Sequence, residues 1–270
     1  MTTDPKLAAQ ERFANKDWGD QGLSLVERCA TDPPIVVAGL VAAIRERANP
    51  DDRVIDLGFG AGWLLEELDG ALPDVQLYGL DMSPGFAGRA YQEHRDRVSV
   101  LMGDMERLPF DDGAFDVVAT CWTLYFMRDV DVALAEIKRC LKPGGRLIAA
   151  TNAPDHEAEC GELVQQAIRA ALGRDDPEFD VAYRFDLVTG DPYVRRHFPK
   201  IDLREWPGEM MISDANDVEA LWPKWEPPLM AEHEQRAVRV EFLRLARERL
   251  NRDGALRIRR RNGAFICDLA

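Results

Sequence analysis

The residues best placed to bind a ligand form a glycine-rich segment in the first quarter of the chain. Residues 54–57 (VIDL) have the pattern of a buried strand and run directly into GFGAG at residues 58–62, after which a helical pattern begins. Glycines let the backbone turn sharply and approach a ligand closely, and the start of a helix offers unpaired N–H groups. Asp81 ends the next apolar run, where a carboxylate can accept both hydroxyls of a ribose. These features predict a nucleotide-type site at the carboxyl ends of two adjacent strands.

Motifs typical of several other catalytic sites are missing from the sequence. No C-x-x-C pair, H-E-x-x-H helix, G-x-S-x-G elbow or G-x-x-x-x-G-K-[ST] loop occurs. We therefore expect neither a disulfide framework nor a metal site, and a reducing compartment, the cytoplasm. The scattered cysteines and histidines are Cys29, Cys121, Cys140, Cys160, Cys267, His94, His156, His197 and His233.

The charge balance argues against nucleic acid as a partner. The sequence has 34 basic and 48 acidic residues, a formal net charge of −14, whereas nonspecific nucleic-acid binding relies on Lys and Arg displacing counterions. Residues 231–270 are the exception, with ten arginines and six acidic residues. Their cluster Arg257, Arg259, Arg260 and Arg261 is interpreted as a solvated strand face, with a phosphate contact as the alternative. No apolar run approaches the ~18 residues that span a bilayer, and the first residues lack a secretory signal, so no membrane partner is expected.

Short apolar runs alternate with helical patterns through the middle of the chain, which is typical of βαβ units. The predicted fold class is α/β: a Rossmann-like, doubly wound sheet of seven strands, mostly parallel with an antiparallel C-terminal edge, plus a helical cap insertion. The core strands are expected at Arg53–Leu57, Val75–Leu80, Val98–Met102, Phe115–Thr120 and Arg146–Thr151. The helices between them are expected at Ala61–Asp69, Pro84–Arg97 and Asp129–Leu141.

The flanking regions suggest a division into four parts. Residues 1–50 are expected to form N-terminal helices or a lid, and residues 51–152 the ligand-binding core. Residues 153–252 are expected to be a mainly helical cap with one core strand near 201–206, and Asp186 is interpreted as the N-cap of a helix running towards His197. Residues 253–270 are expected to form a hairpin that completes the sheet, because Asn262-Gly263 lies between two alternating runs and Asn-Gly tolerates φ > 0.

Four ordered motifs resemble one enzyme family. The segments VIDLGFGAGWL, YGLDMS, GDMERLPFDDGAFDVVAT and LKPGGRLIAAT, which cover roughly Val54–Thr151, are similar to the successive motifs of class I S-adenosylmethionine-dependent methyltransferases, especially the small-molecule branch. The resemblance implies S-adenosylmethionine as cofactor and S-adenosylhomocysteine as product. This sequence departs from the family at Phe59, where many members have a smaller residue. We interpret the ring of Phe59 as a wall of the cofactor pocket.

The resemblance also implies which residues contact the cofactor. Gly58, Gly60 and Gly62 would lie against its methionine and ribose parts, and Asp56 would face its amino group. Asp81 would hold the ribose hydroxyls, and a backbone carbonyl at Cys121 would meet the ammonium. The adenine would lie among Met82, Gly103, Asp104 and Met105, although both methionines could instead be core fillers.

The methyl acceptor is expected beyond the fourth and fifth strands. His156 is the first candidate for a catalytic base because imidazole titrates near neutral pH, with a capping role beside the next helix as an equal alternative. Tyr125 is a second catalytic candidate, and an apolar wall is its other reading. The residues expected to line a small, partly apolar acceptor are Phe13, Trp18, Trp122, Tyr125, Asn152, His156, Tyr183 and His197.

Two other functions remain open at this point. A nicotinamide-dependent reductase uses a similar fold, but the loop lacks the third glycine of G-x-G-x-x-G. A non-catalytic S-adenosylmethionine binder would also need an intact loop and Asp81. The sequence leaves open the acceptor, the atom that is methylated, and whether the protein is a monomer or a homodimer.

Overall fold

The computed structural model describes residues 25–26, 28–94, 96–175, 185–227 and 230–269, and the chain divides into two compact units. The core unit comprises Pro34–Pro154, Tyr183–Trp206 and Asn262–Ala270. The helical unit comprises Met1–Pro33, Asp155–Ala182 and Pro207–Arg261. Residues 185–200, which the sequence pattern assigned to the helical cap, therefore belong to the core unit, together with the core strand expected near 201–206. No helix within the described ranges is both long and apolar enough to cross a membrane.

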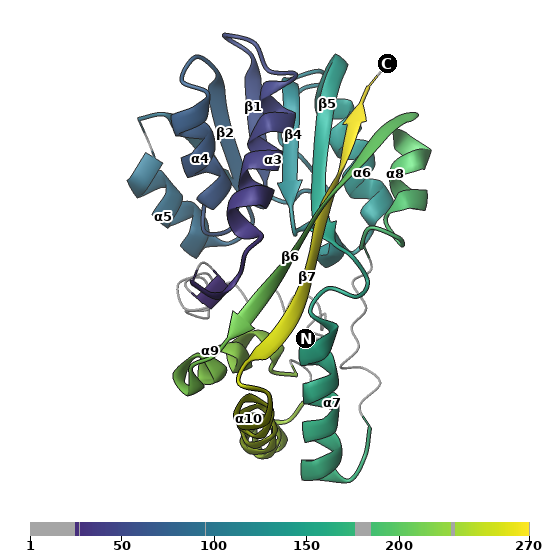
Figure 1. The fold of residues 1–270 in the computed structure, drawn as a ribbon. Helices are drawn as coiled ribbons and strands as arrows, with labels where there is room; N and C mark the ends of the chain where they lie inside the picture. The colour runs from purple at the N-terminus through teal and green to yellow at the C-terminus, as the bar shows by residue number, and fades with distance from the viewer. Residues whose placement is uncertain (1–24, 27, 95, 176–184, 228–229, 270) are drawn as a thin grey trace. The chain divides into compact units, whose positions relative to one another are not determined.

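The predicted α/β class is confirmed by a seven-stranded sheet in the order β3-β2-β1-β4-β5-β7-β6 (Figure 1). Five neighbouring strands are parallel. The chain proceeds outward from β1 to β3 and then returns to the centre at β4, so β1 and β4 flank the topological switch point. Open α/β sheets bind their ligands outside the carboxyl ends of the strands at this point. The parallel strands are β1 (Arg53–Leu57), β2 (Gln76–Asp81), β3 (Val98–Met102), β4 (Phe115–Cys121) and β5 (Leu141–Asn152).

Helices cover both faces of this sheet, which explains why its central strands are continuously apolar. Successive residues of a strand point to opposite faces, so Val117 joins the apolar cluster under α3 and α4, while Val118 joins the one under α6 and α8 (Figure 1). Asp129 begins α6 as its N-cap, accepting hydrogen bonds from the N–H groups of Asp131 and Val132. The helices are α3 (Pro33–Arg45), α4 (Trp63–Ala71), α5 (Pro84–His94), α6 (Val130–Cys140) and α8 (Asp191–His197).

The expected C-terminal hairpin is wrong, although the antiparallel position of this segment is confirmed. β7 (Leu256–Asp268) is one continuous strand, in which Asn262 and Gly263 pair with Asn152 and Thr151 of β5. A Cβ on Gly263 would lie 2.6 Å from the carbonyl oxygen of Arg204 and 2.8 Å from Leu187 Cδ1. The glycine is therefore needed for close packing within the strand and not for a turn. β6 (Lys200–Ile212) extends the expected strand and forms the sheet edge beside β7.

The expected start of α8 at Asp186 is also wrong. The helix begins at Asp191 after the N-cap residue Gly190. Asp186 instead accepts hydrogen bonds from the N–H groups of Val188 and Thr189, at 2.6 and 2.7 Å. Asp side chains stabilise turns and helix starts by the same type of bond, so sequence alone does not separate the two.

The helical unit has its own apolar core. Among its described residues are the helices α7 (Ala158–Leu172), α9 (Ala215–Trp225) and α10 (Glu232–Asp253). Val164, Ile168 and Leu221 are at most 1% exposed in this core. The rings of Trp222 and Phe242 meet with centroids 5.3 Å apart. Trp222, one of the aromatic residues of the expected cap, is thus a residue of this unit's apolar core.

Candidate functional site

The glycine loop takes the conformation that its residue types favour. Gly58, Gly60 and Gly62 have φ of 72°, 55° and 86°, in the left-handed region that other residues rarely adopt. Gly58 has no room for a side chain, because a Cβ would lie 2.3 Å from Thr123 Cγ2, at the end of β4. A Cβ on Gly60 or Gly62 would meet nothing within 4 Å, so the loop leaves open space beside these two residues. Gly62 is also the N-cap residue of α4, whose first N–H groups are available to a ligand.

Asp81 ties the end of β2 to the glycine loop. Its Oδ2 accepts the N–H of Gly60 at 2.9 Å, and its Oδ1 accepts the N–H of Ser83 at 2.8 Å. Burial raises the pKa of Asp81, and these backbone donors offset part of the rise. A carboxylate has about four lone-pair sites, so each oxygen can still accept a hydroxyl. The geometry suits a ribose diol at this position.

Asp56 is buried at the end of β1, only 2% exposed. Its Oδ1 has no hydrogen-bond partner among the residues that the structure describes. Burial and, second, the charge of Asp81 raise the pKa of Asp56 to about 8. Burial and then the charge of Asp56 raise the pKa of the Cys121 thiol well above its usual value. A buried carboxyl oxygen without a partner fits a cofactor that brings a cationic N–H donor.

The residues predicted to surround the adenine divide into exposed and buried positions. Met82 is 43% exposed after β2, so its side chain is available to cover a flat ring. Asp104 is exposed and accepts the N–H of Glu106 at 2.9 Å. Met105 is 4% exposed within the core, with its sulfur 3.9 Å from Thr120 Oγ1, so its side chain is a core filler. A Cβ on Gly103 would lie 2.9 Å from Leu80 Cδ1, which explains the glycine by packing.

The ends of β4 and β5 bring together Trp122 and Asn152, which the sequence analysis predicted, and Trp63, which it did not. Trp122 has φ of 53°, in the left-handed region, and strain of this kind costs about 1–3 kcal/mol and concentrates at functional sites. Its indole Nε1 donates to Asn152 Oδ1 at 2.7 Å. Its ring also contacts Trp63, with centroids 5.7 Å apart. Trp63 was missed by sequence reasoning, although it directly follows the last glycine of the loop. Nearby Tyr125 lies in a single 3-10 turn, Leu124–Phe126.

The predicted histidines are engaged with the chain itself. His156 lies in the helical unit, where its Nδ1 is 2.9 Å from the backbone N–H of Arg261 and its Nε2 is 3.3 Å from Glu157 Oε1. Nδ1 also lies 3.0 Å from the carbonyl oxygen of Arg261, so this backbone engages the ring whichever nitrogen carries the proton. These contacts favour the structural alternative over the catalytic base. His197 Nε2 lies 3.0 Å from Asp131 Oδ1, which links α8 to α6.

Two further expectations need correction, and three fall outside the described ranges. Phe59 does not wall a pocket: it is 3% exposed in the core, and it fills the space that a side chain on Gly79 would need. Arg260 is not on a solvated face, because its side chain is only 9% exposed and its guanidinium pairs with Asp32 and Glu157. The predicted acceptor residues Phe13, Trp18 and Tyr183 lie outside the described residues.

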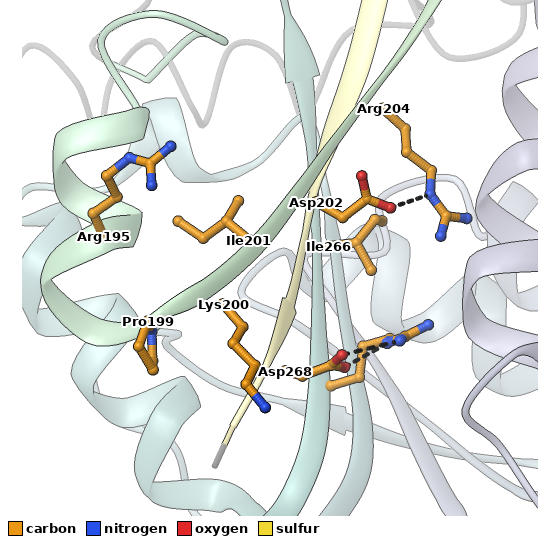
Figure 2. A pocket seen from close by; sticks show the side chains of 9 residues that line it. Arg195, Pro199, Lys200, Ile201, Asp202, Arg204, Ile266 and Asp268 are labelled. Atoms are coloured by element: carbon orange, nitrogen blue, oxygen red, sulfur yellow. Dashed lines mark hydrogen bonds and ion pairs between the residues drawn. The ribbon is translucent and has the colours of Figure 1, made fainter.

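A separate hollow of about 390 Å³ lies at the start of β6 and the end of β7 in the core unit (Figure 2). Its basic side chains are largely matched by acids: Arg146 bonds Asp268 at 2.7 Å and Arg204 bonds Asp202 at 2.8 Å. Arg195 pairs with Asp191 at 2.7 Å. This compensation gives no preference for an anion, and the hollow contains none of the glycine-loop residues. Within the described ranges, no group of three or more His, Cys, Asp or Glu could hold a metal ion.

Comparisons with known proteins agree with this geometry. The methyltransferase domain family matches residues 55–149. The malonyl-[acyl-carrier protein] O-methyltransferase of Hahella chejuensis is 37% identical over 114 residues, which are 42% of this chain and 40% of that protein. The demethylmenaquinone methyltransferase of Thermus thermophilus is 34% identical over 151 residues, 55% of this chain and 64% of that protein. The chain thus spans less than two thirds of either relative.

A solved structure extends the likeness of fold beyond the matched region. The YcgJ protein of Bacillus subtilis superposes with a TM-score of 0.57 at 16% identity, covering 86% of this chain and 97% of that one. At this identity the comparison shows the fold alone. Residues 55–149 thus match the methyltransferase domain family, and the Rossmann-like fold around them agrees with this match.

Proposed function

We propose that the protein transfers a methyl group from S-adenosylmethionine to a small-molecule acceptor. The observation that carries this proposal is the arrangement at the switch point: an open glycine loop after β1, with Asp81 bonded to it at 2.9 Å and the orphaned Asp56 oxygen beside it. The two relatives described above are named as methyltransferases of malonyl-[acyl-carrier protein] and demethylmenaquinone. These names support transfer to an acceptor other than nucleic acid.

Each side of the switch point would hold one part of the cofactor. Asp81 ends β2 and would hold the ribose, and Met82 follows it and would cover the adenine. Asp56 lies at the end of β1, and the N–H groups at the start of α4 lie just beyond Gly62. When bound, the cofactor supplies a methyl group on a sulfonium, whose positive charge disappears as the methyl leaves.

The acceptor would lie on the side of β4 and β5. Trp122 directly follows β4, Asn152 ends β5, and a hydrogen bond joins their side chains, so they present one fixed surface. Holding a nucleophile in line with the methyl group can contribute about 7–11 kcal/mol through orientation alone. The residues of this chain would thus act mainly by positioning the acceptor, without a metal ion or a dedicated base. The net charge of −14 disfavours a polyanionic acceptor.

Binding and turnover can be tested separately. Calorimetry with S-adenosylhomocysteine should show one site, and titration with reduced nicotinamide cofactor should show none. Incubation with methyl-labelled S-adenosylmethionine and a panel of small phenols, amines and carboxylates should then yield a labelled product. Tight nicotinamide binding without S-adenosylhomocysteine binding would favour the reductase. Cofactor binding with no transfer to any small molecule or cell extract would favour the non-catalytic binder.

A further inference from the structure

β6 is the last strand in the order of the sheet, next to β7, and its two halves differ in what lies along the other side. In the helical unit, Ala30 forms an antiparallel bridge with Met210, and the N–H of Thr31 donates to the Glu209 carbonyl oxygen at 2.9 Å. For the first half of β6, residues 200–206, no second strand is paired within the described ranges. An open strand edge presents a row of backbone donors and acceptors to any strand that approaches it.

Two prolines bound this open segment. Pro199 directly precedes residue 200 and Pro207 directly follows residue 206, so Leu203 is the central residue of the segment. Proline has no N–H to donate, so it limits how far an added strand can pair. If a second copy pairs antiparallel about Leu203, Pro199 lies opposite Pro207 at both ends and residues 200–206 all pair. A shift by two residues in either direction places a proline opposite a residue of the open segment.

The charges of the segment fit a second copy in this same register. Asp202 and Arg204 lie on one face of β6, because Arg204 Nε donates to Asp202 Oδ2 at 2.8 Å (Figure 2). A two-fold axis through Leu203 places Asp202 of each copy opposite Arg204 of the other. A shift by two residues places the two copies of Asp202 opposite each other, or the two copies of Arg204. Like charges directly opposite each other destabilise a strand pair, so the charges favour the same register as the prolines.

Leu203 provides the segment with an apolar centre. Its side chain is 43% exposed at the place where the axis would pass. Charged side chains on an edge strand usually discourage pairing with other chains. Here the charges alternate in sign at positions that two-fold symmetry brings together. They therefore favour an identical strand over strands of other sequence.

We propose that the protein forms a two-fold symmetric dimer in which residues 200–206 of β6 pair antiparallel with the same residues of a second copy. The pairing joins the two sheets edge to edge, and each copy contributes the same surface. Backbone hydrogen bonds supply the attraction, and the contacts of Asp202 with Arg204 of the other copy determine the register. Arg204 also bonds Glu46 at 2.9 Å, and this contact is compatible with the dimer because a guanidinium has five N–H donors.

Sedimentation analysis over a range of protein concentrations measures the dimer, and charge reversal tests its register. Wild-type protein should be dimeric and should dissociate on dilution. Asp202→Arg places like charges opposite each other twice in the dimer, so it should raise the dissociation constant at least about tenfold. Arg204→Asp should do the same. The double variant restores opposite charges across the axis and should return to within about threefold of the wild type. Glu46→Gln removes a contact of Arg204 within one copy, and as the matched control it should leave the dimer unchanged.

Disulfide trapping provides a readout that does not depend on charge. Directly opposite residues of antiparallel strands have Cα atoms about 4.5–5.5 Å apart, within the range of a disulfide, so Leu203→Cys should cross-link on mild oxidation. The two copies of residue 202 lie about 8 Å apart, offset by two positions along the strands, so Asp202→Cys should not cross-link. Non-reducing electrophoresis separates the products, and oxidised wild type shows the background from its own five cysteines.

A wild type that is monomeric at every concentration tested would overturn the inference. A dimer that both single charge reversals leave intact would also overturn it, as would equal cross-linking at residues 202 and 203. Far-UV circular dichroism shows whether each variant is folded. If a single charge reversal fails to fold, the double variant and the two cysteine variants still decide between the outcomes.

Discussion

The indole Nε1 of Trp122 donates a 2.7 Å hydrogen bond to Oδ1 of Asn152, and this bond joins the carboxyl ends of β4 and β5. An indole nitrogen is only a donor, so it determines which end of the Asn152 carboxamide faces the ring. The amide nitrogen is thereby turned to the other side. The backbone carbonyl oxygen of Asn152 also accepts the N–H of Leu187 at 3.0 Å, so both the side chain and the backbone of this residue are held. A rigid, oriented carboxamide is suited to positioning an acceptor.

Removing the indole donor should separate acceptor positioning from cofactor binding. Trp122→Phe keeps a ring beside Trp63 but leaves the buried Asn152 oxygen unpaired, which costs about 1–3 kcal/mol. We expect a lower unfolding free energy, an unchanged dissociation constant for S-adenosylhomocysteine, and slower methyl transfer. Chemical denaturation and calorimetry measure the first two. A weakened cofactor affinity equal to the loss of stability would contradict an acceptor-side role.

Asp81 should be required for the nucleoside part of the cofactor. Hydrogen bonds to a charged group contribute about 1.5–3 kcal/mol each, so Asp81→Ala should weaken S-adenosylhomocysteine binding by at least tenfold. Methylthioadenosine should be weakened to a similar extent because it carries the same ribose. Asp111→Asn, on an exposed loop, serves as control. Unchanged affinities in calorimetry would remove Asp81 from the ribose site.

The buried ion cluster of the helical unit should contribute to its stability. Arg260 bonds Asp32 at 2.8 Å and also Glu157, and the carboxylates are 1% and 0% exposed. Arg260→Met would leave two buried carboxylates without their cation, and breaking such a pair costs about 3–5 kcal/mol. The adjacent Arg259, 63% exposed, pairs with Glu159 at the surface, so Arg259→Met should change stability by about 0–1 kcal/mol. If Arg260→Met and Arg259→Met lowered the unfolding free energy equally in chemical denaturation, Arg260 would not be the cation of a buried ion cluster.

Gly263 should not tolerate a methyl group. Gly263→Ala places a Cβ 2.6 Å from the Arg204 carbonyl oxygen, and such overpacking typically costs about 1–3 kcal/mol. Gly70→Ala in α4 meets no atom within 4 Å and should instead stabilise by about 0.5–1 kcal/mol, because alanine favours a helix. Thermal unfolding of the two variants compares them directly. A neutral Gly263→Ala would mean that β7 is packed differently here.

The local pattern of apolar and polar residues predicted the parallel core of the fold, because each strand or helix repeats this pattern along its length. The apolar runs at β1, β4 and β5 and the helical pattern of α6 were all identifiable from sequence. The errors arose where a local signal competes with a distant contact. Asn262-Gly263 has turn chemistry, but pairing with β5 and the proximity of Leu187 decide its conformation. Arg260 looks like part of a surface cluster until Asp32, 228 residues away, is placed beside it.

Asp56 should lower the stability of the ligand-free protein as pH rises. Its pKa is near 8 when folded, above the ordinary value of 3.8, so the folded state binds the proton more strongly than the unfolded state. The stability that this provides is fully present below about pH 4 and is lost as pH rises towards 8, with a maximal slope of about 1.4 kcal/mol per pH unit. Asp56→Asn removes this dependence, so the variant should exceed the wild type in unfolding free energy by an amount that grows between pH 6 and 8.

Denaturation curves of both proteins at several pH values test this, with Asp111→Asn following the wild type at every pH. Asp116 should change stability with pH in the opposite direction, because its pKa is lowered. Burial raises the pKa of Asp116, but the hydrogen bond from Lys142 Nζ at 2.6 Å and further favourable interactions outweigh this desolvation. Stability from Asp116 is retained at neutral pH and lost on acidification, so Asp116→Asn should be destabilising where Asp56→Asn is stabilising. If both substitutions destabilise the protein equally at pH 8, Asp56 is ionised in the ligand-free protein and other groups compensate its charge. That outcome would contradict the description of Asp56 as a buried carboxyl without a partner.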